Sequence, residues 1–197
     1  MKIIKLVLLI LLVASCKNHG KTLPVLSYKI NEEGIKEFYT ISYDGFVNQF
    51  GQPFSTNNIK GKTCVANFFF TRCPSICPPM KQQLIKLSYN MREYDEFIIL
   101  SHTIDMEYDS VDVLHEYWKS TEVPESKWQF LRATESITKE QANLFMTNFR
   151  PNEDGTDFYH STFVALIDKE QQIRGFYNTI SSQEMERLIN DVKLLCN

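Results

Sequence analysis

The stretch Thr63–Phe70, with the sequence TCVANFFF, constrains the fold of this chain more than any other segment. It is a largely apolar run of strand length that is rich in aromatic residues, which indicates a central strand buried on both faces. Strand and helix patterns alternate along most of the remaining chain. Such alternation predicts an α/β fold, in which a sheet with a parallel core is covered by helices on both faces.

The other expected elements follow from apolar periodicity and from turn residues. The last helix is the clearest, because serines precede Glu184 as capping residues and apolar side chains then recur at helical spacing up to Val192. The last two strands are close together, which predicts a terminal antiparallel hairpin over Phe163–Asn178. Strands are expected at Phe38–Tyr43, Thr63–Phe70, Glu96–Ile104, Trp128–Ala133, Thr162–Asp168 and Gln172–Asn178, and helices at Pro78–Tyr94, Ser110–Ser120, Thr138–Phe149 and Ser181–Cys196.

The first residues have the pattern of an export signal. Lys2 and Lys5 precede the apolar run Leu6–Val13, which is too short to span a bilayer because a spanning helix needs about 20 apolar residues. The residues up to Cys16 resemble a bacterial lipobox, in which the cysteine carries a lipid on its sulfur and begins the mature protein. We therefore predict a lipoprotein signal peptide over residues 1–15, a lipidated N-terminus and tether over 16–35, and one domain over 36–197.

This organisation predicts where the protein works. The lipid on Cys16 would anchor it to a membrane of the cell envelope, with the domain outside the cytoplasm, on the periplasmic side. A net charge of −3 gives no electrostatic basis for binding nucleic acid. Lys81, Lys86 and Arg92 fall on one expected helix, and we interpret them as a solvated helix face.

Two cysteines stand where an α/β sheet commonly has its site. Cys73 follows the buried strand, and Cys77 directly precedes Pro78, which suits the first turn of a helix. A thiol at a helix N-terminus is favoured as thiolate, and open α/β sheets bind ligands beyond the carboxyl ends of their strands. The pair is therefore a metal site, an exchangeable disulfide or, less in keeping with its position, a packing feature. Cys64 lies within the strand and is expected to pack in the core, and Cys196 ends the last helix without an evident partner.

A soft metal bound by two thiolates takes a further ligand, most often an imidazole. His160 is the best candidate, because it directly precedes a strand and follows a polar loop. His102, near the end of a strand, could approach the thiols, although we expect a structural role for it. His115 is expected at the surface of a helix, and His19 in the tether.

Three stretches of the chain together are similar to one family. GKTCVANFFFTRCPSICPPM, LSHTIDMEYDSVDVLHEYW and YHSTFVALIDKEQQIRGFYN resemble the Sco/SenC family of copper-binding, thioredoxin-like proteins. The Cys-x-x-x-Cys-Pro motif matches at Cys73, Cys77 and Pro78, and the distal histidine of the family matches at His160. Asp105 and Asp109 fall where the family carries an aspartate-containing loop, and Tyr159 stands where it often has aspartate, with Asp157 close by.

The resemblance implies a thioredoxin-like fold with a central mixed sheet, helices on both faces and a terminal antiparallel hairpin. It also implies a copper site made by Cys73, Cys77 and His160, which would hold Cu(I) and tolerate Cu(II). An ordinary thioredoxin has proline before the strand that faces its cysteine pair, and His160-Ser161-Thr162 occupies that stretch here. The implied function is to receive copper from a donor protein and to serve the binuclear copper site of a respiratory terminal oxidase.

A second function belongs to a different class. A thiol-disulfide reductase would use Cys73 and Cys77 as a redox-active, catalytic pair on the cysteines of the oxidase. A peroxide-reducing relative of the same fold is disfavoured, because such enzymes place threonine or serine three positions before the reactive cysteine, whereas Pro74 holds that position before Cys77.

Overall fold

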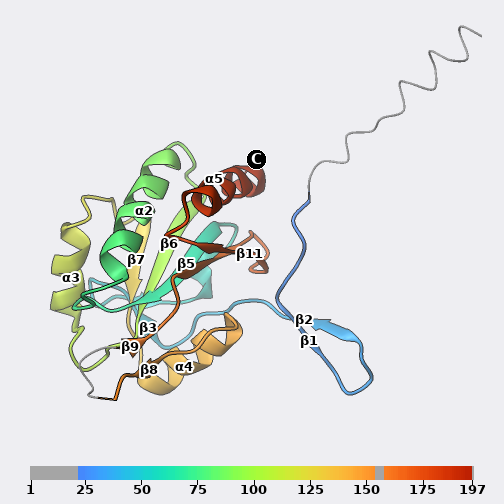
Figure 1. The fold of residues 1–197 in the computed structure, drawn as a ribbon, viewed down its shortest axis with the longest axis horizontal. Helices are drawn as coiled ribbons and strands as arrows, with labels where there is room; N and C mark the ends of the chain where they lie inside the picture. The colour runs from blue at the N-terminus through green and yellow to red at the C-terminus, as the bar shows by residue number, and fades with distance from the viewer. Residues whose placement is uncertain (1–21, 154–157, 197) are drawn as a thin grey trace, which may run out of the picture.

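A mixed sheet of five strands forms the centre of the protein in a computed structural model, which describes residues 22–153 and 158–196 (Figure 1). Its strand order is β11-β10-β5-β6-β7. Strands β5, β6 and β7 run parallel, and β10 is antiparallel to both β5 and β11. The predicted mixed sheet and terminal hairpin are thus confirmed. The strands are β5 (Thr63–Phe69), β6 (Phe97–Thr103), β7 (Trp128–Leu131), β10 (Phe163–Ile167) and β11 (Ile173–Asn178).

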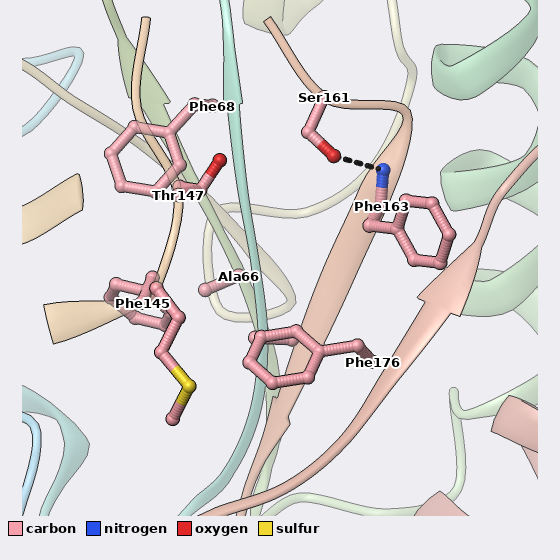
Figure 2. A pocket seen from close by; sticks show the side chains of 9 residues that line it. Ala66, Phe68, Phe145, Thr147, Ser161, Phe163 and Phe176 are labelled. Atoms are coloured by element: carbon pink, nitrogen blue, oxygen red, sulfur yellow. Dashed lines mark hydrogen bonds between the residues drawn. The ribbon is translucent and has the colours of Figure 1, made fainter. Parts of the chain in front are cut away.

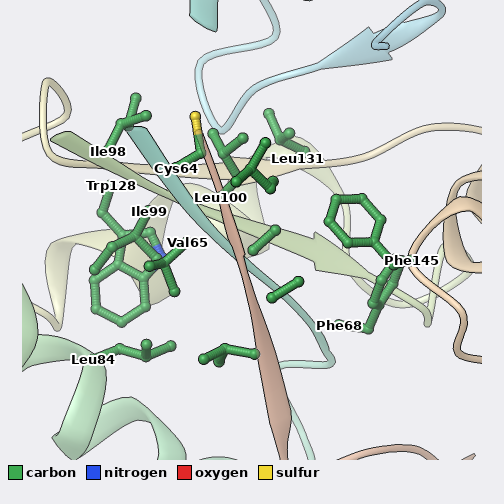
Figure 3. Close-up of a cluster of buried hydrophobic side chains, with 14 of the residues drawn as sticks. Cys64, Val65, Phe68, Leu84, Ile98, Ile99, Leu100, Trp128, Leu131 and Phe145 are labelled. Atoms are coloured by element: carbon green, nitrogen blue, oxygen red, sulfur yellow. The ribbon is translucent and has the colours of Figure 1, made fainter. Parts of the chain in front are cut away.

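Helices cover both faces of this sheet, as predicted. On one face lie α2 (Cys77–Asn90), α3 (Val111–Lys119) and α5 (Ser182–Cys196), and α2 and α5 lie side by side (Figure 1). On the other face, the chain at the end of α4 (Glu135–Leu144) packs through Phe145 against Phe68 of β5. Figure 3 shows Leu84 of α2 on one side of the strands and Phe68 with Phe145 on the other.

Strand β5 is buried along its whole length, as the composition of its sequence predicts. Its side chains alternate between the two faces, and each pairs in register with β6, Val65 with Ile99 and Phe68 with His102. A central strand buried on both faces can carry apolar residues at every position. The carboxyl end of β5 is therefore held at a fixed place at the edge of the core, and the chain that leaves it carries Cys73.

Short elements lie outside the main sheet. Residues 28–38 form a hairpin that extends from the body of the protein (Figure 1). Two further short pairs and one turn of 3-10 helix complete the set. These elements are β1 (Tyr28–Ile30) with β2 (Lys36–Phe38), β3 (Phe46–Val47) with β4 (Pro53–Phe54), η1 (Thr56–Ile59), and β8 (Arg150–Pro151) with β9 (Phe158–Tyr159).

Part of the predicted tether contacts the domain. The Leu26 amide donates to the carbonyl of Ile173 at 2.7 Å, and the Arg174 guanidinium donates to the carbonyl of Leu23. Leu23 and Leu26 thus lie against β11. The predicted signal peptide, Cys16 and His19 lie outside the described residues. Over the part of the chain that the structure describes, no helix has the length and apolar composition to cross a membrane.

The strand predicted at Phe38–Tyr43 is wrong beyond Phe38. Ile41 and Tyr43 are buried, which explains the strand-like alternation of their sequence. Their segment forms no ladder because its amides donate to three separate parts of the chain. These bonds run from Tyr39 N to Ser27 O, from Ile41 N to Gln171 O, and from Tyr43 N to Thr56 Oγ1.

The helix predicted at Thr138–Phe149 begins and ends earlier than expected. The Thr134 side chain accepts a hydrogen bond from the Ile137 amide and caps the helix, which therefore starts at Glu135. Beyond its end, Met146 has a φ of 53°, a left-handed conformation that prevents the helix from continuing. The apolar residues up to Phe149 that suggested a longer helix belong to the following turn.

Candidate metal centre

Three ligand atoms meet near the carboxyl end of β5. The sulfurs of Cys73 and Cys77 and a ring nitrogen of His160 lie within 4.8 Å of one another. His160 Nε2 is 3.8 Å from Cys73 Sγ and 3.6 Å from Cys77 Sγ. No second cluster of three histidine, cysteine or acidic side chains with this spacing occurs over residues 22–153 and 158–196. The fold thus brings together the three residues that the sequence singles out, in a group that could hold a metal ion.

The two cysteines are positioned by the start of α2. Cys77 is the first residue of the helix, and Pro78 follows in the first turn, where a missing amide costs no helical hydrogen bond. The Cys77 amide therefore has no partner within the helix, and it donates to Cys73 Sγ at 3.4 Å. Both side chains are nearly buried, with 6% of Cys73 and 3% of Cys77 exposed.

Hydrogen bonds favour the thiolate form of Cys73. The pKa of Cys73 is lowered to about 3, first by the hydrogen bond with the Cys77 thiol, against the opposing effect of burial. The hydrogen bond with His160 and the Cys77 amide lower the pKa further. A thiolate is both the metal-binding and the nucleophilic form of cysteine. The site is therefore prepared for a soft metal or for thiol exchange at neutral pH.

His160 lies in the turn between β9 and β10. Its ring packs edge-on against Phe70, with 5.6 Å between ring centres. Ser161 shapes the following turn, because its Oγ accepts a hydrogen bond of 3.1 Å from the Phe163 amide, as Figure 2 shows. Strand β10 pairs with β5, so this turn is brought next to the loop that carries the cysteines. Position, rather than local sequence, makes His160 a neighbour of the thiols.

The second ring nitrogen of His160 is unusual. Nδ1 is buried and has no hydrogen-bond partner among the described residues. In metal-binding histidines, the ring nitrogen that does not bind the metal commonly donates its N–H hydrogen to a carboxylate or a carbonyl. Tyr159 offers no such acceptor, because its side chain is 57% exposed and stacks on the Arg150 guanidinium. Asp157 lies outside the described residues.

Two aspartates hold the loop that precedes Cys73. Asp109 accepts hydrogen bonds from the amide and hydroxyl of Thr71 and from the Thr103 hydroxyl. Asp105 accepts a hydrogen bond of 2.6 Å from Arg72, whose guanidinium also lies over the Tyr108 ring. The aspartates were expected from the family's loop. Sequence reasoning missed their partners, because no spacing in the chain signals a contact between the β5–α2 loop and the β6–α3 loop.

The other predicted core residues lie away from the thiols. His102 is fully buried between the Tyr43 and Phe68 rings, and its Nδ1 is 3.0 Å from the Asn67 carbonyl oxygen. Burial lowers the pKa of His102 to about 4, so the ring is neutral at physiological pH. Cys64 is also fully buried, and burial raises its pKa to about 12. Both residues are structural, as expected.

His115 differs from its prediction. It is half-buried rather than at the surface, and its ring packs edge-on against Phe50, with 5.1 Å between ring centres. Helical spacing alone does not reveal this contact, because Phe50 comes from a loop far away in the sequence. Cys196 is buried at the end of α5.

One hollow adjoins the two cysteines, and another lies on the opposite face of the sheet. A cleft of about 460 Å³ is lined by both cysteines, together with residues of α2 and α3. A separate apolar pocket of about 230 Å³ lies on the other face of the sheet, where Phe145, Phe163 and Phe176 surround Ala66 (Figure 2). Only the first hollow gives a ligand or a partner access to the sulfurs.

Comparison with known proteins agrees with this architecture. The sequence profile of the SCO1/SenC family matches residues 36–197. The chain is 26% identical over 158 residues to the SCO1 protein homolog of Bacillus subtilis, covering 79% of this chain and 82% of that protein.

Solved structures are similar over most of their length. The crystal structure of a SCO1/SenC family lipoprotein from Bacillus anthracis has a TM-score of 0.74 at 27% identity, covering 88% of this chain and 98% of that one. Yeast Sco1 with copper bound has a TM-score of 0.61 at 25% identity, covering 79% of this chain and 87% of that one. The fold, the motif and the matched residues lead to one conclusion: the chain belongs to the SCO1/SenC family.

Proposed function

We propose that the protein binds one copper ion through Cys73, Cys77 and His160 and delivers copper to the binuclear copper site of a respiratory terminal oxidase. The observation that carries the proposal is the approach of the three ligand atoms to within 4.8 Å of one another. Thiolates select soft Cu(I), and an imidazole nitrogen suits both copper states. Copper is here a cargo, which the site must hold and then release.

The chemistry of the donors supports this proposal. The thiolate of Cys73 is available without a bound metal, because hydrogen bonds lower its pKa to about 3. No disulfide joins Cys73 and Cys77 in the structure, and copper requires reduced, deprotonated sulfur. Oxidation of the pair to a disulfide would remove two of the three ligands. Copper loading is thus expected to depend on the redox state of the pair.

The direct experiment is copper stoichiometry and optical spectroscopy on the reduced protein. We expect one equivalent of Cu(II) with an intense thiolate-to-copper charge-transfer band. His160→Ala should lose this band and bind copper at least about tenfold more weakly, since a ligand is removed. His115→Ala is the matched control, because it removes an imidazole outside the site. Tight copper binding by His160→Ala would refute the site.

A second function is favoured by the cleft and by the lowered pKa of Cys73. In thiol-disulfide exchange, a thiolate of the pair would attack a target disulfide and form a mixed disulfide, and the second cysteine would then displace the reduced target. This activity is compatible with copper delivery, because a target must be reduced before it can bind copper. Rapid exchange with a model disulfide that is unaffected by copper and by His160→Ala would favour the reductase over the copper carrier.

The place of action rests on the N-terminus. We infer that Cys16 is lipidated after removal of residues 1–15, which would hold the domain at the membrane surface on the periplasmic side. The charged start, the apolar run and the lipobox-like end of this segment support the inference. A SCO1/SenC relative of similar structure is itself described as a lipoprotein. A lipid anchor would keep the site close to a membrane-bound oxidase and to a copper donor.

A further inference from the structure

The cleft beside the two thiols contains a lysine ammonium group that is held in place by its neighbours. Lys81 lies one helical turn after Cys77 on α2 and lines the cleft of about 460 Å³. Its ammonium donates to Ser120 Oγ at 2.6 Å and lies 4.1 Å from the centre of the Tyr117 ring. The side chain is half-buried, so the solvated position predicted for Lys81 is wrong, whereas Lys86 on the same helix is exposed.

Two carboxylates of the described residues, those of Glu116 and Asp109, have partners other than Lys81. No ion pair of Lys81 with a carboxylate occurs in the described part of the chain. On α3, Glu116 is paired with Lys119 at 2.8 Å. Asp109 is buried, and its carboxylate accepts hydrogen bonds from the amide and the hydroxyl of Thr71. Burial lowers the pKa of Lys81, the direction expected for a cation that is partly desolvated.

The remaining walls of the cleft suit a peptide. Thr71, Gln82 and Ser120 provide polar side chains, and Tyr117, Pro78 and Pro79 provide apolar surface. The thiols lie at the same cleft and are almost fully covered elsewhere, with 6% and 3% of Cys73 and Cys77 exposed. A group that reaches the sulfurs through this cleft therefore shares the cleft with the Lys81 side chain.

We propose that Lys81 binds a carboxylate of the acceptor polypeptide, next to the cysteine that approaches Cys73 and Cys77, so that the cleft selects acidic acceptors. The inference rests on the proposed function, since both copper delivery and thiol exchange require an acceptor cysteine at these sulfurs. Lys81 is a positioning residue, because it acts on the acceptor and not on the copper or the reacting sulfurs. A charge pair at about 4 Å that stays accessible to water gives a preference of about fivefold.

Thiol-disulfide exchange with three matched peptide disulfides tests this proposal on the reduced protein. The probes are the disulfide dimers of acetyl-Glu-Cys-Gly-amide, acetyl-Gln-Cys-Gly-amide and acetyl-Lys-Cys-Gly-amide. In each reaction a protein thiolate breaks the probe disulfide, the second protein cysteine displaces the remaining probe thiolate, and two electrons pass from the protein to the probe. Each rate is divided by the rate of the same probe with 2-mercaptoethanol, which removes its intrinsic reactivity.

We expect the Glu probe to react about fivefold faster than the Gln probe and the Lys probe to react most slowly. Lys81→Met should abolish this order, and Lys81→Arg should retain it. Lys86→Met is the matched control on the exposed face of α2 and should keep the wild-type order. Raising the ionic strength from about 0.05 M to 0.5 M should reduce the preference, because salt screens charge pairs.

Two outcomes would overturn the proposal. Equal normalised rates for the Glu and Gln probes would show that the cleft does not select a carboxylate. A preference that persists in Lys81→Met would assign the selection to another group. Copper stoichiometry measured on the wild-type protein separates these failures from a failure of the proposed function, because it does not depend on an acceptor.

Discussion

The surroundings of Cys64 and Cys73 shift the pKa values of their thiols in opposite directions. Burial within β5 raises the pKa of Cys64 to about 12, so that its thiol stays protonated and packs as a small apolar group. Hydrogen bonds from Cys77, and secondarily from His160, lower the pKa of Cys73 to about 3. Both residues are nearly inaccessible, so burial does not distinguish them. The difference comes from hydrogen-bond donors, because Cys73 Sγ accepts from the Cys77 amide, whereas Cys64 Sγ lies 3.8 Å from the carbonyl oxygen of Lys62.

His102 gives a prediction for the pH dependence of stability. Burial lowers its pKa from 6.5 to about 4 in the folded protein. The unfolded chain therefore binds the proton first, so stability is full above pH 6.5, is lost as the pH falls toward 4, and changes no further below that. At about 1.4 kcal/mol per pKa unit, the loss in the free energy of unfolding is about 3 kcal/mol.

Denaturant unfolding at several pH values checks this prediction. His102→Asn is the comparison, because asparagine does not titrate and can still donate to the Asn67 carbonyl. The difference in unfolding free energy between wild type and variant should narrow by about 3 kcal/mol from pH 7 to pH 4. If the difference in unfolding free energy between wild type and His102→Asn stayed constant with pH, His102 would not be a buried, neutral ring.

At the scale of elements, two loops from neighbouring parallel strands build the candidate metal centre. The β5–α2 loop carries Cys73 and ends at Cys77, the first residue of α2, and the β6–α3 loop carries the aspartates that hold it. Parallel strands place these loops at the same edge of the sheet. The third candidate ligand, His160, lies in the turn before β10, which pairs with the opposite side of β5. Three segments thus converge because β5 is central.

Asp109→Ala tests how strongly the two loops depend on each other. The substitution leaves the Thr71 amide and two threonine hydroxyls without their buried acceptor. We expect the free energy of unfolding to fall by about 3 kcal/mol, as for loss of a buried charged hydrogen-bond partner. Glu107→Ala, an exposed change in the same loop, should stay within about 0.5 kcal/mol of wild type. Equal stability of the two variants in denaturant unfolding would show that Asp109 does not hold the loops.

At the scale of the whole molecule, the N-terminal segment of the described domain contacts β11. Leu23 and Leu26 contact the sheet through hydrogen bonds with Arg174 and Ile173. Few residues therefore separate Cys16 from the body of the domain. If Cys16 carries a lipid, the metal centre works close to the membrane surface and its freedom to move away is small.

Cys16→Ser tests this arrangement in cells. We expect the wild-type protein to be recovered in the membrane fraction and to incorporate a labelled fatty acid, and the variant to lose both properties. Cys196→Ser is the control, because it removes a cysteine that is buried within the domain. Membrane association of Cys16→Ser without fatty-acid labelling would overturn the lipid anchor and favour another mode of attachment.

The sequence by itself determined the alternating α/β pattern, the central position of β5 and the candidates Cys73, Cys77 and His160. Apolar runs, capping residues and a short motif are local features, because they depend only on residues close together in the sequence. Only the tertiary structure decided that His160 Nε2 lies 3.6 Å from Cys77 Sγ, that Asp109 holds Thr71, and that Lys81 lines the cleft. These contacts depend on strand order and on which loops share a sheet edge, and no spacing along the chain records that choice. The mistaken strand at Phe38–Tyr43 has the same cause, since its alternation reports burial but not the partners of its backbone amides.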